Sequence, residues 1–417
     1  MTEFLYQLFA VVLQSLMQIG ARFSPKLKLG SEGRKGLLQT LELSFESLSQ
    51  GRPVAWFHAA SLGEFEQGRP VIEAFRNEFP NHFIVLTFFS PSGYEIRKNY
   101  GGADYICYLP IDTKSNAQRF VRAVKPQIVF FIKYEFWFNY LKELRKSGAV
   151  ILSFSTIFRP GQVFFKFYGG FYRQMLTYFD HIFVQNEESL SLLNNSGIYQ
   201  CSLAGDTRFD RVKTIADGVK DLPVIAQFVD HHSCLVAGSV WETDMQVLIP
   251  ALNTLETPIK VIIAPHEIKP DEIATWREKL SGKSVLYSEY EKSSVNQSYD
   301  ILIIDNIGML SSLYRYGTMA YIGGAFGSGL HNILEAATFG LPIIFGNKSY
   351  EKFQEAKDLI ARGGAFVVAD SNEVGQVLAK FSLNSQARVS GEVNKKYVAL
   401  KTGATDKVIE QAKILLK

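Results

Sequence analysis

The sequence predicts two doubly wound α/β domains, because apolar runs of strand length alternate with helix-like stretches along nearly the whole chain. Runs this apolar suit parallel strands covered on both faces, and their alternation with helices is typical of a doubly wound sheet. The 417 residues, 47% of them hydrophobic, are enough for two domains of ordinary size. The first series of runs is 54–59, 83–89, 105–109, 128–132, 150–154, 181–185 and 201–204, and the second is 234–237, 260–264, 284–287, 301–304, 318–322, 343–345 and 365–368.

The polar stretch 214–230, which contains Gly218 and Pro223, separates the two series and marks the expected domain boundary. We therefore expect an N-terminal segment over residues 1–30, a first sheet domain over 31–215 and a second over 216–417, with the last helix packing back on the first domain. Ligands of such sheets bind at the carboxyl ends of the strands. The shared site is expected in the cleft between the two domains.

Composition narrows the choice of partners and cofactors. A net charge of +3 gives no support for a nucleic-acid partner. The three cysteines, Cys107, Cys201 and Cys234, lie far apart and are expected to be reduced, as in a cytoplasmic protein. No metal-ligand spacing is present, so the sequence indicates neither a metal site nor a cofactor.

The N-terminus has a composition of its own. Residues 4–21 carry no charge, and a cluster of basic residues follows them, whereas a signal peptide is basic before its apolar run. The run is barely long enough to span a bilayer, and Gln7, Gln14 and Gln18 fall along one helical face, as in a helix that lies in the interface. The trailing basic cluster favours a cytoplasmic position for the body of the protein. The alternative is an amphipathic helix packed on the domain of a soluble protein.

A glycine-rich turn at 323–329 lies between the apolar run 318–322 and a helix expected over 332–339. Glycines let the backbone come close to a ligand, and a helix start offers free N–H groups to an anion. Glu335 could accept hydrogen bonds from a ribose diol, and Asn332 could cap the helix or bind phosphate. A plain strand-to-helix turn is the alternative, but the combination with His331 favours a nucleotide site.

Glu64 is the candidate catalytic residue. It follows the first expected strand and begins a helix, with Ser61 as a candidate N-cap. A helix start is expected to stabilise the charged carboxylate, which could then act as a general base. Helix-end stabilisation without catalysis is the alternative, and His58 is expected to be a core histidine.

Polar residues follow several other expected strands. Lys133 and Glu135 could form an ion pair or line the acceptor site, and Arg159 ends another strand–loop passage. Arg208 could reach a phosphate or a sugar carboxylate, or pair with Asp206 or Asp210. In the second series, the residues that could contact a nucleotide are Ser239, Glu242, Pro265 and His266. Glu242 as a simple helix start and His266 as a surface histidine are the alternatives.

Six motifs together resemble the 3-deoxy-D-manno-octulosonic acid (Kdo) transferases of lipopolysaccharide synthesis, a family of GT-B glycosyltransferases (family 30). The resemblance covers nearly the whole chain, although Lys133 stands where an acidic residue is common. The motifs are HAASLGE at 58–64, the segment 135–137, GDTRFD at 205–210, AGSVWE at 237–242, APHE at 264–267 and GLHNILEAATFGLP at 329–342.

The resemblance implies an inverting transfer of Kdo from CMP-Kdo to the glucosamine disaccharide of a lipid A precursor, without a metal ion. It implies that Glu64 is the general base, and that the protein works on the cytoplasmic face of the inner membrane among membrane lipids. It also implies an acceptor domain followed by a donor domain, the donor nucleotide lying against Arg208, Ser239, His266, Asn332 and Glu335.

Two other functions remain open from the sequence. A GT-B transferase that uses a UDP-sugar and acts on another membrane lipid would have the same fold. A non-catalytic membrane protein that binds glycolipids through a relic nucleotide site would share the N-terminal segment. The intact Glu64 and donor motifs favour an enzyme over the second alternative.

Overall fold

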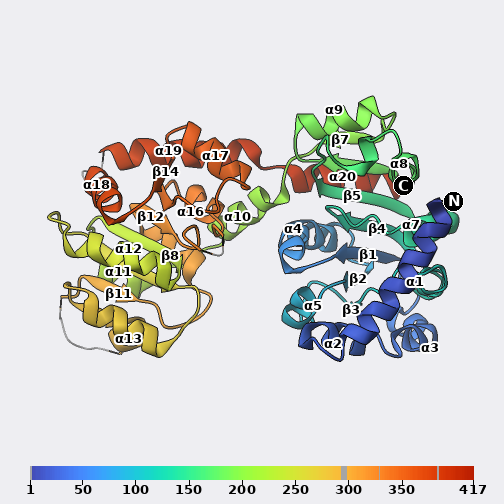
Figure 1. The fold of residues 1–417 in the computed structure, drawn as a ribbon, viewed down its shortest axis with the longest axis horizontal. Helices are drawn as coiled ribbons and strands as arrows, with labels where there is room; N and C mark the ends of the chain where they lie inside the picture. Colours follow the sequence, from blue (N-terminus) through green and yellow to red (C-terminus); the bar gives the residue numbers. More distant parts are fainter. Residues whose placement is uncertain (1, 293–297, 328, 383–384) are drawn as a thin grey trace. The chain divides into compact units, whose positions relative to one another are not determined.

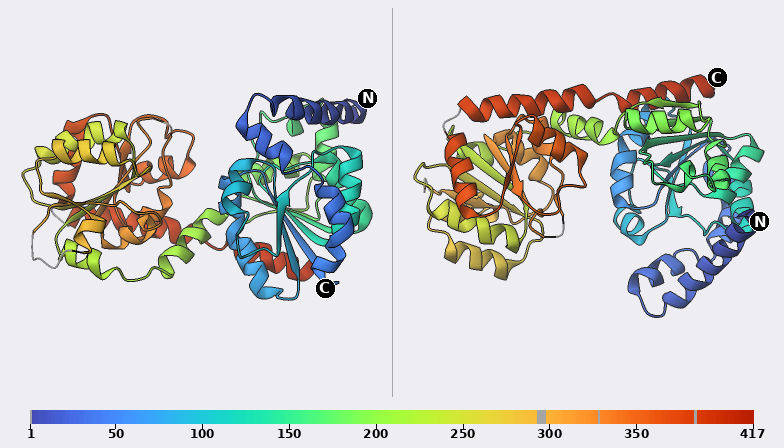
Figure 2. Two further views of the ribbon diagram at one scale, coloured as in Figure 1. Left: turned by 90° about the horizontal axis from the view of Figure 1, so that it is seen from below. Right: turned by 45° about the horizontal axis from the view of Figure 1, so that its top comes forward.

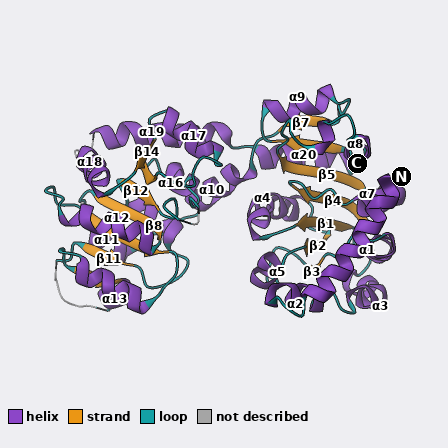
Figure 3. Ribbon diagram, in the orientation of Figure 1, coloured by secondary structure: helices purple, strands orange, loops and turns teal. Residues whose placement is uncertain are grey.

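The protein forms two compact units, each built on a seven-stranded parallel sheet (Figure 1). The computed structural model describes residues 2–292, 298–327, 329–382 and 385–417. Unit 1 comprises Met1–Arg211 and Thr402–Lys417, and unit 2 comprises Val212–Lys401. In both units helices cover the two faces of the sheet (Figure 3). The predicted fold class, two doubly wound parallel α/β domains, is confirmed.

The sheet of unit 1 has the strand order β3-β2-β1-β4-β5-β6-β7, and every neighbouring pair is parallel. Its strands are β1 (Val54–Ala59), β2 (Phe83–Phe88), β3 (Tyr105–Tyr108), β4 (Pro126–Ile132), β5 (Val150–Thr156), β6 (His181–Val184) and β7 (Cys201–Leu203). Its helices are α1 (Thr2–Gly20), α2 (Pro25–Glu32), α3 (Leu37–Ser49), α4 (Leu62–Glu78), α5 (Pro91–Arg97), α6 (Lys114–Val124), α7 (Phe138–Ser147), η1 (Val163–Phe165), α8 (Gly170–Leu176), α9 (Glu187–Asn195), α10 (Thr207–Asp217) and α20 (Ala404–Leu415). Helix α10 continues beyond Arg211, the last residue of this part of unit 1.

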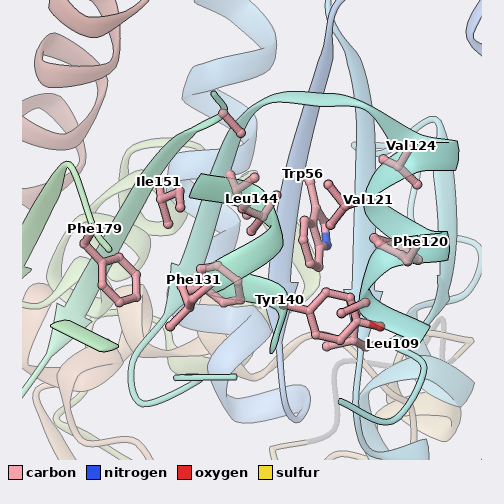
Figure 4. Close-up of a cluster of buried hydrophobic side chains, with 14 of the residues drawn as sticks. Trp56, Leu109, Phe120, Val121, Val124, Phe131, Tyr140, Leu144, Ile151 and Phe179 are labelled. Atoms are coloured by element: carbon pink, nitrogen blue, oxygen red, sulfur yellow. The ribbon is translucent and has the colours of Figure 1, made fainter. Parts of the chain in front are cut away.

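Alternate residues of β1 face two separate hydrophobic clusters. Trp56 packs with Phe120 and Phe131 on the side covered by α3, α6 and α7 (Figure 4). Phe57 packs with Phe75 on the side covered by α4 and α20. Burial of both faces explains why the strand is apolar throughout rather than alternating. The last helix adds Ala404, Val408, Ile409 and Ala412 to the second cluster.

The sheet of unit 2 has the strand order β10-β11-β9-β8-β12-β13-β14, again all parallel. Its strands are β8 (Cys234–Val240), β9 (Lys260–Pro265), β10 (Ser284–Leu286), β11 (Ile301–Ile303), β12 (Met319–Ile322), β13 (Ile343–Gly346) and β14 (Ala365–Val368). Its helices are α11 (Pro223–Val229), α12 (Glu242–Asn253), α13 (Pro270–Lys279), α14 (Tyr287–Tyr290), α15 (Leu310–Leu313), η2 (Tyr314–Tyr316), α16 (Leu334–Thr338), α17 (Gln354–Ala361), α18 (Ser371–Ser382) and α19 (Ser385–Lys401).

Helix α1 lies on the outside of unit 1 (Figure 2), and polar side chains bind it to the rest of the unit. The hydroxyl of Tyr6 donates to Oδ2 of Asp112 at 2.6 Å, and Nε2 of Gln7 donates to Oδ1 of Asn139 at 2.5 Å. Ala10 is the buried apolar residue of the helix. The sequence predicted an amphipathic helix, but its glutamine face turns toward the protein rather than toward solvent.

The apolar side of α1 is consequently left in solvent. Its large hydrophobic side chains are between 44% and 71% exposed, and they are Phe4, Leu5, Leu8, Phe9, Val11, Val12, Leu16 and Ile19. Among the described residues, no single helix has the length and apolarity that crossing a membrane requires. Helices α1 and α2 meet that criterion only as a pair, and a bend of 118° separates them.

Candidate active site

Glu64 lies at the carboxyl end of β1, in the first turn of α4. Ser61 is the residue that precedes this helix, but its side chain makes no capping hydrogen bond. The Glu64 carboxylate turns back instead, and its Oε2 accepts a hydrogen bond of 2.6 Å from the backbone N–H of Ala60. The carboxylate is thereby held at the edge of the sheet where ligands of such folds bind.

The charge state of Glu64 differs from the sequence expectation. Burial, and then the charge of Glu135, raise the pKa of Glu64 to about 7, although Lys133 and the backbone amides oppose the shift. The helix start was expected to stabilise the charged form, and that expectation is wrong because desolvation outweighs the helix-end interaction. A carboxyl group with a pKa near neutrality is well suited to accept a proton from a substrate.

Glu135 is held beside Glu64 by a chain of buried hydrogen bonds. The indole N–H of Trp56 donates to Oγ1 of Thr87 at 2.8 Å, and this oxygen lies 2.8 Å from Nδ1 of His58. Nε2 of His58 lies 3.2 Å from Oε2 of Glu135, which also accepts from Trp137 Nε1 at 2.8 Å.

The directions of these bonds follow from the groups involved. The Trp137 N–H lies 3.2 Å from Nε2 of His58 but is closer to Glu135, so we assign its hydrogen bond to the carboxylate. Because a carboxylate only accepts, the His58–Glu135 contact then requires the His58 proton on Nε2, and the Thr87 hydroxyl, which accepts from Trp56, donates to Nδ1. His58 is fully buried, as expected of a core histidine. It also orients Glu135, which the sequence argument did not foresee.

Lys133, Tyr134 and Arg159 complete the surroundings of Glu64. Lys133 has a positive φ of 64° and its charge lowers the pKa of Glu64, so it lies within electrostatic reach. Burial raises the pKa of Tyr134; Arg159 opposes this shift and Glu64 adds to it. Tyr134 therefore lies among the predicted residues, although the sequence argument did not single it out. Arg159 is exposed.

Unit 2 has a cavity of about 490 Å³ at the carboxyl ends of β8, β9 and β11. Three of the predicted donor-site residues, Ser239, Pro265 and His266, line it. Ser239 has a positive φ of 53° at an irregularity in the pairing of β8 with β9. A side chain on Gly323 would collide with the Ser239 backbone, at 2.2 Å from its carbonyl oxygen. The glycine after β12 therefore permits the close approach of two backbones at this cavity.

Asp244 organises the start of α12, and the sequence argument missed it. Its Oδ2 accepts from the backbone N–H groups of Trp241 and Gly324, each at 2.9 Å, and its Oδ1 accepts from the Tyr321 hydroxyl at 2.9 Å. The side chain is fully buried, and burial raises its pKa. An aspartate in the first turn after AGSVWE was the available signal, but its partner Gly324 is distant in sequence.

His266 lies in a stack with two other aromatic rings. Its ring centroid is 4.3 Å from that of Trp241 and 4.4 Å from that of His331. The Trp241 indole donates to Nε2 of His331 at 2.9 Å, so neutral His331 carries its proton on Nδ1. Burial and the charge of His266 lower the pKa of His331 to about 4. His331 is therefore neutral near pH 7 and has a fixed N–H to offer a ligand.

The helix after the glycine turn is shorter than expected. It begins at Leu334 rather than at Asn332, and Asn332 precedes it, with Oδ1 accepting from the Leu334 N–H at 3.2 Å. Nδ2 of Asn332 donates to Oε1 of Glu335 at 3.1 Å, and Ser311 donates to Oε2 at 2.6 Å. Asn332 and Glu335 are thus brought together as predicted, with Ser311 as an additional partner. Ser328 of the glycine turn lies outside the described residues.

Two predicted donor residues have partners within the protein. Oε2 of Glu242 accepts from the indole of buried Trp276 at 2.5 Å. Arg208 belongs to unit 1, where its Nη2 lies 2.8 Å from Oδ2 of Asp206. Burial opposes ionisation of Asp206, but the charge and hydrogen bonds of Arg208 outweigh it and hold the pKa of this carboxyl below its usual value. The contact with Asp206 matches the alternative interpretation of Arg208, and Glu242 is the first residue of α12, as its own alternative interpretation has it.

Among the described residues, no group of three or more His, Cys, Asp or Glu side chains could hold a metal ion.

Comparison with known proteins shows which enzymes the chain resembles. The family model of 3-deoxy-D-manno-octulosonic-acid transferase (kdotransferase) matches residues 33–211. The 3-deoxy-D-manno-octulosonic acid transferase of Chlamydophila psittaci is 28% identical over 341 residues, which cover 77% of this chain and 76% of that enzyme. The chain is therefore similar to Kdo transferases over most of its length.

A second Kdo transferase shows the same similarity, and solved structures show the same fold. The 3-deoxy-D-manno-octulosonic acid transferase of Aquifex aeolicus is 25% identical over 336 residues, which cover 79% of this chain and 86% of that enzyme. Among solved structures, the Neisseria meningitidis UDP-GlcNAc 2-epimerase bound to UDP-GlcNAc has a TM-score of 0.59 at 13% identity, with 86% of this chain and 98% of that chain covered. MurG of Acinetobacter baumannii has a TM-score of 0.56 at 12% identity and covers 86% of this chain and 98% of its own. At these identities the structures show the fold alone, which is the predicted GT-B type.

Glu64→Gln should be more stable than wild type, by a difference that grows as the pH rises. Between the usual glutamate pKa of 4.5 and the value of about 7 in the fold, the unfolded chain loses the Glu64 proton while the folded chain keeps it. Wild-type stability therefore falls over this interval and levels off above it. At pH 8 the free energy of unfolding of the variant should exceed that of wild type by an amount on the order of 2 kcal/mol, a value reduced for the solvent that reaches the side chain.

Denaturant unfolding at pH 4.5, 6 and 8 measures this gain. Glu66→Gln is the matched control, because Glu66 lies in the same helix but pairs with Arg97 at 2.6 Å. It should show no gain. A Glu64→Gln variant whose stability difference from wild type stays constant with pH would contradict the raised pKa.

Proposed function

We propose that this protein is a Kdo transferase, an inverting glycosyltransferase that moves Kdo from CMP-Kdo to the glucosamine disaccharide of a lipid A precursor. The observation that carries the proposal is the carboxyl group of Glu64, whose pKa is raised to about 7 at the carboxyl edge of the unit 1 sheet. The similarity to Kdo transferases supports the identity of the sugar that is transferred, and the raised pKa of Glu64 supports its role as a general base.

The proposed step is a displacement at the anomeric carbon of Kdo. The oxygen of the acceptor hydroxyl forms a bond to this carbon as the bond to the CMP phosphate oxygen breaks, and CMP leaves with the electron pair. The hydroxyl proton passes to the Glu64 carboxylate. Lys133 and Arg159 supply positive charge near the reacting groups, and Glu135 keeps the Glu64 carboxylate basic.

Unit 2 is proposed to bind the CMP part of the donor. The cavity lined by Ser239, Pro265 and His266 has the volume of a small-molecule site. The carboxylate of Glu335, fixed by Ser311 and Asn332, has acceptor capacity left for ribose hydroxyls. Arg208 is proposed as a contact to the donor, in addition to its pairing with Asp206. Glu242 keeps the same proposed role beside its bond to Trp276.

Helix α1 is proposed to attach the protein to the cytoplasmic face of the inner membrane. Its polar side chains bind unit 1 and its apolar side chains face outward, which is the reverse of a surface helix in a soluble protein. Such a surface suits contact with lipid, and the acceptor proposed above is itself a lipid.

Mass analysis of the product tests the reaction. Purified protein incubated with CMP-Kdo and a lipid A precursor should yield the precursor with Kdo added. CMP should inhibit and UDP should not. Inhibition by UDP with transfer from a UDP-sugar would favour the UDP-sugar transferase, and binding of the lipid without any turnover would favour a non-catalytic protein.

Glu64→Gln should lower turnover by about 100-fold or more, because it removes the base but keeps the shape. The KM for CMP-Kdo should stay near the wild-type value. Wild-type turnover should rise with pH around the Glu64 pKa of about 7. In Glu135→Gln this rise should move to lower pH, since the neighbouring negative charge is gone. Wild-type turnover in Glu64→Gln would end the general-base assignment.

The double variant Leu8→Glu/Leu16→Glu should lose binding to lipid vesicles, because charged groups on the outward side of α1 oppose burial in the interface. Its melting temperature should remain close to wild type, since neither residue contacts the core. Leu400→Glu, on α19 and 81% exposed, is the control and should still bind. Vesicle co-sedimentation measures the difference, and retained binding of the double variant would place the membrane contact on another surface.

A further inference from the structure

A second cavity, of about 900 Å³, lies in unit 1 behind the N-terminal helices. Side chains of α1, α2 and α3 form its walls, and Pro110 and Ile111, which follow β3, contribute to its lining. Apolar and polar groups share the surface, as Met17 and Leu38 lie among glutamines and basic residues. None of the residues proposed above for catalysis or for the donor lines this cavity.

The lining is strongly cationic. The lining contains one acidic residue, Glu32, and five basic residues, which are Arg22, Lys28, Arg34, Lys35 and Arg119. The surplus of positive charge in the lining therefore exceeds the net charge of +3 of the whole chain. Arg119 is already paired with both carboxylate oxygens of Glu42, each at 2.7 Å. In the described part of the chain, the side chains of Arg22, Lys28 and Lys35 have no hydrogen bond or ion pair. Cations concentrated without acidic partners attract an anion.

Arg34 links this cavity to the edge of the sheet that carries Glu64. Its guanidinium donates to the carbonyl oxygens of Leu109 and Phe89, each at 2.7 Å, which follow β3 and β2. No carboxylate within the described ranges pairs with Arg34, and burial lowers its pKa to about 10. Since Phe89 follows β2, the neighbour of β1, the cavity borders the carboxyl edge at which Glu64 lies.

An apolar surface begins at the same turns of α1. Met17 and Arg22 line the cavity, while Leu16, Ile19 and Phe23 are 58%, 56% and 83% exposed beside it. A cationic cavity next to an exposed apolar surface matches an amphiphile with an anionic head group and hydrocarbon chains. An amphiphile of this kind would use both surfaces at once.

We propose that this cavity binds a phosphate-bearing part of the lipid acceptor, whose acyl chains then run along the outward side of α1. The proposal rests on the proposed function for the identity of the acceptor. Lys28, Lys35 and Arg22 contact the phosphate, and Arg34 holds α2 at the sheet edge so that the head group lies close to Glu64. The cavity thus sets which lipids are substrates, and Glu64 acts on the hydroxyl.

The test uses the full chain with Lys28→Glu/Lys35→Glu, and with Lys26→Glu as the matched control. Lys26 lies on the same helix and is exposed, but it does not line the cavity. With acceptor in neutral detergent micelles, the double variant should raise the KM for the lipid about tenfold and leave the KM for CMP-Kdo unchanged. The control should change neither by more than about twofold.

Direct binding separates this proposal from the proposed function. Wild-type protein should bind micelles that contain the phosphorylated lipid more tightly than micelles with the dephosphorylated lipid, and the double variant should lose this preference. That result supports the cavity even if no Kdo is transferred. An unchanged preference in the folded double variant would overturn the proposal. Loss of binding to phosphatidylglycerol vesicles with an unchanged acceptor KM would also overturn it, because the cavity would then serve bulk phospholipid.

Discussion

The chain of hydrogen bonds from Trp56 through Thr87 and His58 to Glu135 is the interaction on which the unit 1 site depends. A carboxylate at the edge of an apolar sheet is costly unless donors satisfy it, and here both His58 and Trp137 donate to Glu135. Glu135 is therefore fixed close enough to Glu64 to raise the pKa of its carboxyl group. The Glu135 carboxylate is thus held in place by hydrogen bonds, and its charge keeps the pKa of Glu64 raised.

Parallel pairing brings these groups together. β1 lies between β2 and β4, so His58, Thr87 and Phe131 share one level of the sheet, and the segments after the three strands emerge at the same edge. In unit 2 as well, segments that follow parallel strands meet at one edge of the sheet, but other residues hold them together. There a buried aspartate, Asp244, joins the start of α12 to the glycine turn after β12, and the absence of a side chain at Gly323 lets two backbones meet.

The N-terminal helices carry the surface that we propose for contact with lipid. The polar side of helix α1 binds the rest of unit 1, and its apolar side is exposed. Arg34 fixes α2 to the ends of β2 and β3 through backbone carbonyls rather than through a carboxylate. The basic residues around it are not paired with this guanidinium, and the cationic lining lies beside exposed apolar side chains, the combination that the proposed anionic lipid requires.

The sequence by itself determined the fold class, the positions of the strands and the similarity to Kdo transferases. Strands buried on both faces must be apolar throughout, and that pattern is visible in a single chain. The motifs also predicted Ser239, Pro265 and His266 as site residues, and these residues line one cavity.

The sequence could not determine the charge state of Glu64, because it depends on burial and on the charge of Glu135, which is distant in sequence. Likewise the partner of Asp244 is Gly324, and the helix after the glycine turn begins at Leu334 instead of Asn332 because Asn332 bonds to the Leu334 amide from outside the helix. Local pattern fixes strands and turns, whereas desolvation and contacts between distant segments exist only once the sheet has formed.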